Sequence, residues 1–282
     1  MFRTRLVSGI VLIIIALLAL WTGGPVLASI LLAISMIAFK ELTNTMNVSE
    51  PGQKEARTLL GRFSMLEYIG FGGILLYYAT VFLEGAEVMQ LMCIVGVFMA
   101  MMFAYVAVFP KIRIEKVVAA FFAFLYAPVM LSFVYLTRMC PQGIYIVWLI
   151  LISSWGCDTC AYLVGILIGK KKIFPVLSPK KSLEGCIGGV LGAALIGGLY
   201  GHFVVEPVFP DQTVAWIIAF ICAASSVASQ MGDLAASGIK RNHDVKDYGK
   251  LIPGHGGIMD RFDSMIVTAP VIYFLTILML EL

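Results

Sequence analysis

Long apolar blocks alternate with short polar segments along the whole chain of 282 residues. Each block holds about 20 residues, the length a helix needs to cross the hydrocarbon core of a bilayer. The pattern predicts an all-α, polytopic integral membrane protein with about nine transmembrane helices. The predicted spans run from Leu6 to Trp21, Val26 to Phe39, Tyr68 to Leu83, Val88 to Phe109, Val117 to Leu136, Ile144 to Gly169, Cys186 to Val205, Val214 to Met231 and Ser264 to Leu280.

The composition agrees with this pattern. Hydrophobic residues make up 60% of the chain and charged residues 13%, and the mean hydropathy is +0.95. These values exclude an ordinary soluble globular protein. The net charge of +3 gives only weak attraction to anionic lipid, and no nucleic-acid partner is expected.

Basic residues predict the orientation, since Lys and Arg near the ends of spans stay in the cytoplasm. Of the 20 Lys and Arg residues, all except Arg138 precede the first span or follow the second, fourth, sixth and eighth. The N-terminus is therefore predicted to be cytoplasmic and the C-terminus to lie outside. The expected location is the cell (inner) membrane, as a multi-pass protein whose two most polar loops face the cytoplasm.

The sixth predicted span carries Asp158 near its middle. A carboxylate at that depth costs at least about 2.5 kcal/mol on insertion scales, so it is expected to face a cavity or a partner. Ser154, Asp158 and Tyr162 recur at helical spacing and are followed by glycines, which places them on one face. This face is typical both of a binding site and of a hydrogen-bonded patch between helices.

The loop after this span holds five lysines and a turn that contains a proline. One interpretation is simple anchoring by positive charge on the cytoplasmic side. The other is a polyphosphate site, because ammonium and hydroxyl groups on a proline-fixed turn present their donors in set positions. The candidates for substrate contact in this loop are Ser178, Lys180, Lys181, Ser182 and Glu184.

Carboxylates mark the end of the eighth span and the start of the ninth. Asp233, Ser237 and Lys240 align on one face if the eighth helix continues, and Asp260 and Asp263 are three residues apart. Mg²⁺ is typically held by one or two carboxylates with water and substrate phosphates, so these groups predict a Mg²⁺ site at the cytoplasmic boundary. Asp260 and Asp263 could instead only complement the positive end of a helix.

A glycine-rich stretch lies between these carboxylates. Gly256 and Gly257 permit a left-handed backbone and a close approach of the chain to phosphate. His255 stands between glycines and is interpreted either as a donor to phosphate or as an acid. The basic and acidic residues around this stretch are Lys240, Arg241, Lys246, Asp247, Asp260 and Arg261.

These residues carry a family resemblance. The chain resembles CDP-diacylglycerol synthase, the phosphatidate cytidylyltransferase family, over about residues 150 to 264. The stretches that carry it are Ser154-Trp155-x-x-Asp158-Thr159-x-Ala161-Tyr162, Ser178-Pro179-Lys180-Lys181-Ser182-x-Glu184-Gly185, Gly232-Asp233-Leu234, Ser237-x-x-Lys240-Arg241-x4-Lys246-Asp247 and Pro253-Gly254-His255-Gly256-Gly257-x-x-Asp260-Arg261-x-Asp263-Ser264. The chain departs from the family pattern at Cys157, Cys160, Ile166, Leu183 and Ala236, which bears on substrate detail.

The resemblance implies transfer of the cytidylyl group of CTP to phosphatidate, giving CDP-diacylglycerol and pyrophosphate in phospholipid biosynthesis. The expected partners are CTP, phosphatidate and membrane lipid, and the expected cofactor is Mg²⁺. A second cation stays open, and Asp158 is expected either to bind that cation or to support the metal ligands from behind. The expected metal ligands are Asp233, Asp260 and Asp263. The expected catalytic residues are Asp233, Lys240, Arg241, Lys246, Asp247, His255, Asp260, Arg261 and Asp263. The expected substrate contacts are Asp158, Tyr162, Ser178, Lys180, Lys181, Ser182, Glu184, Ser237, Gly256 and Gly257.

The sequence leaves other functions open and gives an expected division of the chain. A CTP-dependent polyprenol or lipid kinase, or another lipid cytidylyltransferase, would share the metal and nucleotide needs. A secondary transporter of an anionic substrate would also place charges at helix ends. We expect residues 1–140 to form a scaffold with lipid access and residues 141–282 to carry the catalytic motifs, within one integrated membrane domain. A homodimer is a further open alternative.

Overall fold

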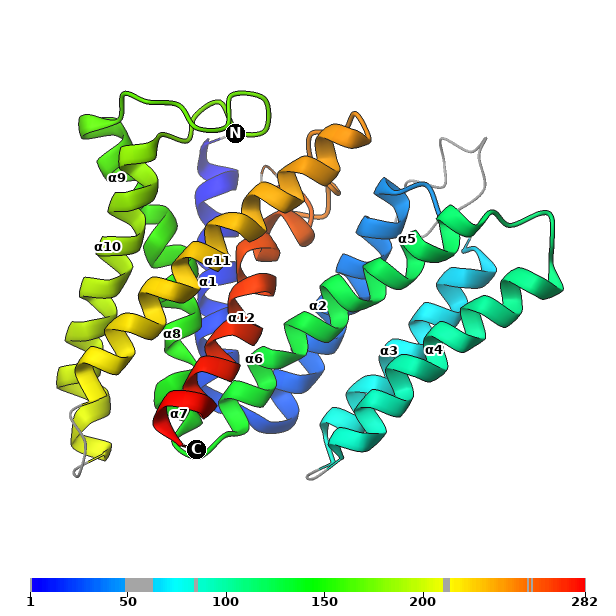
Figure 1. Ribbon diagram of the computed structural model, residues 1–282, viewed down its shortest axis with the longest axis horizontal. Coiled ribbons are helices and arrows are strands. Elements are labelled where there is room, and N and C mark those ends of the chain that lie inside the picture. The colour runs from blue at the N-terminus through cyan, green and yellow to red at the C-terminus, as the bar shows by residue number, and fades with distance from the viewer. Residues whose placement is uncertain are drawn as a thin grey trace. The chain divides into compact units, whose positions relative to one another are not determined.

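The computed structural model describes residues 2–48, 63–83, 86–209, 214–252, 254 and 256–281. Across these residues the secondary structure is helical, with two isolated β-bridges and no strand (Figure 1). The α-helices are α1 (Phe2–Thr22), α2 (Gly24–Thr45), α3 (Met65–Val81), α4 (Glu87–Ala107), α5 (Ile114–Phe124), α6 (Met130–Met139), α7 (Gly143–Ile146), α8 (Trp148–Leu151), α9 (Cys157–Ile168), α10 (Leu183–Tyr200), α11 (Val214–Asn242) and α12 (Met259–Leu280). The π-helical segments η2 (Leu125–Val129), η3 (Ile152–Gly156) and η4 (Gly201–Val205) continue α5, α8 and α10, and the 3₁₀ turn η5 (Glu206–Val208) follows.

The predicted spans all fall on these helices. In the described part of the chain, 7 helices are long and apolar enough to cross a membrane, and two shorter apolar helices, Ser8–Thr22 and Met65–Val81, add to them. The all-α, polytopic membrane fold is therefore confirmed. Several helices extend beyond their predicted ends: α2 runs on to Thr45, α11 runs on to Asn242, and α12 begins at Met259. Hydropathy detects only the apolar part of a helix, whereas the backbone bonds continue through polar residues that favour helix.

Two compact units make up the chain, and each draws on separate stretches of the sequence. The first unit comprises Met1–Ala19, Gly24–Ser132 and His243–Arg261. The second unit comprises Leu20–Gly23, Phe133–Asn242 and Phe262–Leu282. The predicted division into residues 1–140 and 141–282 is a division of the sequence and stays a prediction.

A buried ion pair ties two helices of the first unit together. Lys40 Nζ of α2 lies 2.8 Å from Glu67 Oε1 of α3, and the two side chains are 2% and 0% exposed. The hydroxyl of Thr43 donates to the same oxygen at 2.8 Å, and the N–H of Ser64 donates to Glu67 Oε2 at 2.8 Å. Buried charges are tolerated only when they are paired and hydrogen-bonded, as here. Lys40, which the charge pattern placed in a cytoplasmic loop, lies instead inside α2.

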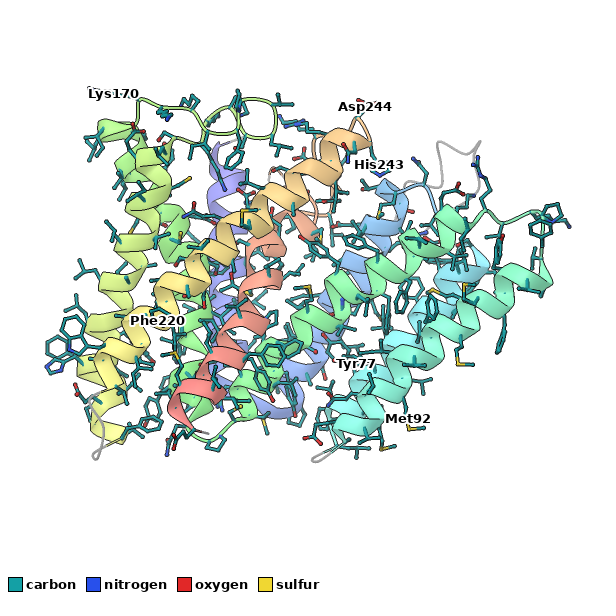
Figure 2. All side chains as sticks on the ribbon, viewed as in Figure 1. Tyr77, Met92, Lys170, Phe220, His243 and Asp244 are labelled. Carbon is teal, nitrogen blue, oxygen red and sulfur yellow. The ribbon has the colours of Figure 1, made fainter. Side chains whose placement is uncertain are left out.

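Many large apolar side chains on the helices are exposed. Met92 of α4 is 67% exposed and Phe220 of α11 is 56% exposed (Figure 2). Such large exposed side chains would be unfavourable in water but are expected of helices that face lipid. The exposure pattern therefore agrees with the transmembrane assignment made from length and hydropathy.

Glycines let α10 pack closely against its neighbours in the second unit. A Cβ added at Gly188 would lie 2.6 Å from Val164 Cβ of α9, and one added at Gly192 would lie 2.5 Å from Cys160 Sγ. Small residues at such contacts allow transmembrane helices to approach and gain dispersion contacts. The loop before α10 is thereby held close to α9, where Asp158 lies.

Candidate active site

Three aspartates from three helices lie near one another in the second unit. Asp158 belongs to α9, Asp233 to α11 and Asp263 to α12. The charge of Asp233 acts on both of the others, and that of Asp158 acts on Asp263. We call these three residues the carboxylate cluster. Like charges at short range repel, so cations nearby stabilise the ionised form of these carboxyl groups.

Two lysines supply positive charge to the carboxylate cluster. Lys181 Nζ lies 2.5 Å from Asp233 Oδ2, and the two side chains are 20% and 29% exposed. Lys240, about two turns along α11 from Asp233, exerts its charge on Asp263. The predicted alignment of Asp233 with Lys240 required the helix to continue past Met231, and α11 does so. That prediction is confirmed.

A glycine explains why α11 and α12 come so close at the cluster. A Cβ added at Gly232 would lie 3.0 Å from the backbone oxygen of Asp263 and 2.9 Å from Val267 Cγ2. Because glycine has no side chain, the two backbones can meet here. The next residue, Asp233, therefore lies beside Asp263.

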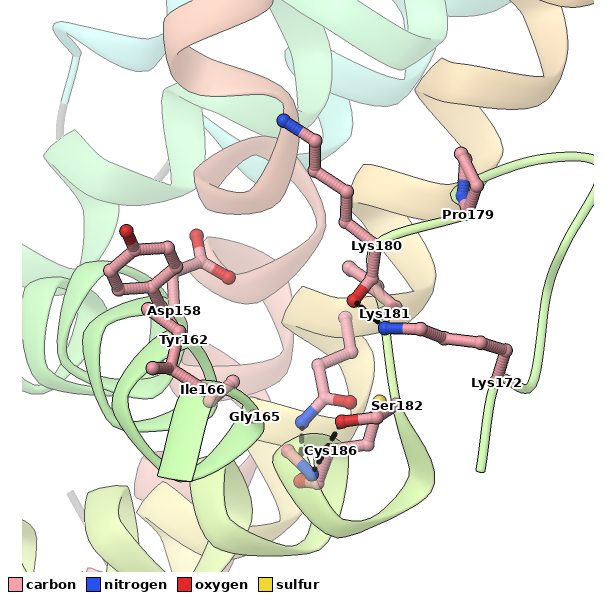
Figure 3. A pocket seen from close by; sticks show the side chains of 13 residues that line it. Asp158, Tyr162, Gly165, Ile166, Lys172, Pro179, Lys180, Lys181, Ser182 and Cys186 are labelled. Atoms are coloured by element: carbon pink, nitrogen blue, oxygen red, sulfur yellow. Dashed lines mark hydrogen bonds between the residues drawn. The ribbon is translucent and has the colours of Figure 1, made fainter. Parts of the chain in front are cut away.

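A cavity of about 500 Å³ in the second unit includes one member of the cluster in its wall. Figure 3 shows Asp158 and Tyr162 of α9 on one side and Lys172 and Lys180 of the loop before α10 on the other. Ile166 adds an apolar surface below Tyr162. We call this cavity the lysine pocket. Its combination of ammonium groups with an apolar wall suits an amphiphile that carries a negative charge.

Backbone contacts hold the loop that carries these lysines. The carboxylate of Glu184 accepts the N–H of Lys170 at 3.0 Å. The hydroxyl of Ser182 accepts the N–H of Gly185 at 3.2 Å and thereby caps α10. Glu184 and Ser182 thus keep the loop in place, and their predicted substrate contacts, like that of Ser178, stay predictions.

Gln230 of α11 is a site residue that the sequence analysis missed. Its Nε2 donates to the backbone oxygen of Cys186 at 3.0 Å and contacts Cys157 Sγ at 3.3 Å. It also lines the lysine pocket. Its signal in the sequence was a lone amide in an apolar span, two residues before Gly232. The amide joins α11 to α9 and to α10 behind the pocket.

The first unit holds a second polar cavity, of about 590 Å³. Lys246, Asp247 and Arg261 line it with exposed side chains, and Gly256 forms part of its wall. Gly256 has a φ of +87°, in the left-handed region that the glycine pattern predicted. We call this cavity the glycine-loop pocket. His255, predicted to act on phosphate, lies outside the described residues.

Asp260 supports the same loop from inside the first unit. Its side chain is buried, and Oδ2 accepts the N–H of Tyr248 at 2.8 Å and the N–H of Gly257 at 3.0 Å. Asp260 also lies in the first turn of α12, where a carboxylate complements the helix dipole. Asp260 thus complements the positive end of a helix, as one of the two interpretations of the sequence expected. The other interpretation, that Asp260 is a metal ligand, stays a prediction.

Glu41 of α2 is a second residue that the sequence analysis missed. It is 2% exposed, and its carboxylate accepts the N–H of Ile258 at 3.1 Å and that of Met259 at 2.8 Å. Its signal was an acidic residue two positions after the predicted end of an apolar span, a position typical of a loop. Because α2 continues to Thr45, Glu41 lies instead inside the first unit.

The remaining predicted residues lie on helices that carry the cluster and the lysine pocket. Ser237 and Arg241 follow Asp233 on α11, and Arg241 is exposed in the last turn. Tyr162 is 68% exposed on α9. Their predicted roles require substrate contacts and stay predictions.

Two members of the carboxylate cluster, Asp233 and Asp263, have the donor chemistry that a divalent cation takes. Among the described residues, no three His, Cys, Asp or Glu side chains stand close enough to enclose a metal ion. Mg²⁺ does not require such a group, since it usually takes one or two carboxylates and completes its shell with water and phosphate. Asp233 and Asp263 are neighbours on α11 and α12, and both are only partly buried. They provide the oxygen donors that such an ion prefers.

Comparison with known proteins gives a match along nearly the whole chain. The model of the cytidylyltransferase family matches residues 3–279. A phosphatidate cytidylyltransferase of Staphylococcus saprophyticus subsp. saprophyticus is 30% identical over 281 residues, which cover 98% of this chain and 99% of the relative. A phosphatidate cytidylyltransferase of Staphylococcus epidermidis is 30% identical over 283 residues, with 98% and 99% covered. One of Staphylococcus aureus is 32% identical over 279 residues, with 98% and 99% covered.

Proposed function

The chain belongs to the cytidylyltransferase family, and from this premise we propose that it is a phosphatidate cytidylyltransferase. The reaction transfers the cytidylyl group of CTP to phosphatidate and gives CDP-diacylglycerol and pyrophosphate. As a nucleotidyltransferase of phospholipid biosynthesis, it needs a place for phosphates, cations and a lipid. The observation that carries the proposal is the carboxylate cluster with its two lysines, Lys181 and Lys240. Asp158 of the cluster and Lys181 line a pocket that is both cationic and apolar.

The chemistry is a single displacement at phosphorus. A phosphate oxygen of phosphatidate forms a bond to the α-phosphorus of CTP. The bond from the α-phosphorus to the oxygen that bridges to the β-phosphate breaks, and pyrophosphate leaves with the electron pair. Such reactions depend on positioning and on electrostatic stabilisation, and they require no covalent nucleophile on the protein.

We propose that Asp233 and Asp263 hold Mg²⁺. Bound there, Mg²⁺ would neutralise charge on the nucleotide phosphates and on the leaving pyrophosphate. Lys181 pairs with Asp233 and lines the lysine pocket. In this proposal it neutralises the Asp233 carboxylate before substrate binds and contacts a substrate phosphate when the pocket is filled. Lys240 balances the charge of Asp263.

The two pockets suit different parts of the substrates. The lysine pocket offers Lys172, Lys180 and Lys181 to a lipid phosphate and Ile166 to an acyl chain. The glycine-loop pocket offers Lys246 and Arg261 with a glycine-rich backbone, which suits the phosphates of CTP. Arg and Lys at fixed positions are the usual protein groups for phosphate.

The protein is a multi-pass membrane protein, and we propose that it lies in the cell membrane with its active site towards the cytoplasm. The distribution of basic residues supports this orientation. It also places the site where the nucleotide is available. A homodimer is compatible with the exposed apolar helices and stays a prediction.

Product analysis tests the proposal against its rivals. Purified protein is incubated with CTP, Mg²⁺ and phosphatidate in detergent, and the soluble products are separated. A cytidylyltransferase releases pyrophosphate and no CDP, whereas a CTP-dependent lipid kinase releases CDP. A transporter consumes no CTP at all. No observation on this chain favours either alternative, and release of CDP in step with lipid phosphorylation would replace our proposal.

A further inference from the structure

We infer that Glu41 is a positioning residue for the glycine-loop pocket. It holds the backbone that presents Lys246, Asp247 and Arg261, and its loss should weaken binding of a nucleoside triphosphate there. The identity of that ligand as CTP rests on the proposed function. The placement of the loop by Glu41 rests on contacts within the first unit alone.

Both carboxylate oxygens of Glu41 are used on consecutive backbone groups. Oε1 accepts from the N–H of Ile258 at 3.1 Å and Oε2 from the N–H of Met259 at 2.8 Å. Met259 is the first residue of α12, so these N–H groups lack partners within the helix. A buried N–H without a partner costs about 1–3 kcal/mol, so the carboxylate satisfies groups that would otherwise destabilise the turn.

Two glycines make room for the Glu41 carboxylate. A Cβ added at Gly249 or at Gly257 would collide with its oxygens. Gly257 belongs to the predicted phosphate loop, and Gly249 lines the glycine-loop pocket. Residues 249 and 257 must therefore be glycines because the Glu41 carboxylate lies against their backbone. A phosphate bound close to the same backbone would add a second reason.

Glu41 and Asp260 act on one loop from two directions. Asp260 Oδ2 takes the N–H groups of Tyr248 and Gly257, and Glu41 takes the next two N–H groups along the chain. The loop also contains a backbone hydrogen bond of its own, in which the N–H of Ile252 donates to the carbonyl oxygen of Gly256 at 2.9 Å. Two buried carboxylates thus fix both ends of the loop that lines the pocket.

A carboxylate is required at this position for a simple reason. A glutamate offers acceptors only, whereas glutamine offers one acceptor and one NH₂ group. Glu41→Gln would keep the volume and set an N–H donor against another N–H donor. One backbone group at the start of α12 would lose its partner, and the loop would shift or open.

The test compares Glu41→Gln with Glu67→Gln in the full chain purified in detergent. Glu67 is the comparison, because it is also buried, lies in the same unit and accepts a backbone N–H, that of Ser64, at the start of a different helix. Unlike Glu41→Gln, Glu67→Gln also breaks the buried ion pair with Lys40, so its larger effect is expected on stability. For Glu41→Gln we expect the KM for CTP to rise about ten-fold, with the KM for phosphatidate changed less than about two-fold. Amide hydrogens of residues 256–260 should exchange about ten-fold faster, as one stabilising contact is lost. For Glu67→Gln, thermal stability should fall without this selective change.

The outcomes separate this inference from the proposed function. If the wild-type protein makes no CDP-diacylglycerol, the proposed function fails, and the amide exchange alone decides whether Glu41 positions the loop. Unchanged exchange at residues 256–260 in Glu41→Gln would overturn the inference, as would an equal rise in the KM for CTP in Glu67→Gln. If Glu41→Gln does not fold, Glu41→Asp takes its place: it keeps both acceptors on a shorter reach and should show the same selective change to a smaller degree.

Discussion

Lys181 Nζ on the loop before α10 lies 2.5 Å from Asp233 Oδ2 on α11. This ion pair joins two motifs that are far apart in the sequence. The Lys181 ammonium nitrogen is buried, and the Lys181 side chain lines the lysine pocket, so the pair stands at the edge of that cavity.

Replacing Asp233 by Asn should abolish most of the activity. Asn keeps the volume but removes the charge that a hard cation requires. We expect kcat to fall by about 100-fold or more, as for the loss of other groups that stabilise transition-state charge. Product formation at several Mg²⁺ concentrations is the measurement.

The matched control is Asp244→Asn. Asp244 is exposed and has a φ of 53°, which Asn adopts as readily as Asp. Its activity should stay within about two-fold of the wild type, as is usual for exposed positions. Equal losses of activity in the two variants would contradict a specific role of Asp233 in the reaction. Full turnover of Asp233→Asn at limiting Mg²⁺ would contradict its role as a metal ligand.

Replacing Lys181 by Met should weaken use of the lipid substrate. Met keeps the length of the stem and removes the ammonium group, which leaves Asp233 without its partner and the lysine pocket with less charge. We expect the KM for phosphatidate to rise about ten-fold, equivalent to the loss of one charged hydrogen bond. Kinetics with phosphatidate in mixed micelles give the value. Lys111→Met, at an exposed lysine outside the motifs, is the control, and an equal effect there would contradict the assignment.

Replacing Gly188 by Ala should destabilise the fold. The new Cβ would lie 2.6 Å from Val164 Cβ, so α9 and α10 would have to separate. Overpacking of this kind typically costs about 1–3 kcal/mol. Thermal unfolding in detergent measures the change. Gly72→Ala is the matched control, because nothing lies within 4 Å of a Cβ there. Comparable loss in both variants would show that α10 does not depend on this contact.

Cysteines introduced at Lys172 and at Lys250 test the orientation. Both positions lie in loops that the basic residues place in the cytoplasm. With the native cysteines replaced, a membrane-impermeant maleimide should label both only in inverted vesicles. Labelling of either one in intact cells would overturn the predicted topology and would separate that loop from the nucleotide.

Local patterns predicted much of this architecture, and long-range contacts escaped them. Asp233 and Lys240 could be aligned in advance because helical spacing alone relates them. The partner of Asp233 could not be derived, since Lys181 reaches it only through the packing of α10 against α11. Glu41 was missed for the same reason, because the N–H groups it binds lie more than 200 residues later, at 258 and 259.

The most direct measurement uses CTP labelled either in the cytosine ring or in the γ-phosphate, with Mg²⁺ and with or without phosphatidate. After extraction of the lipid, the ring label should appear in the lipid phase only when phosphatidate is present, and the γ-phosphate label should stay in the water phase as pyrophosphate. Transfer of the γ-phosphate label to lipid without the ring label would contradict the cytidylyltransferase assignment and identify a kinase.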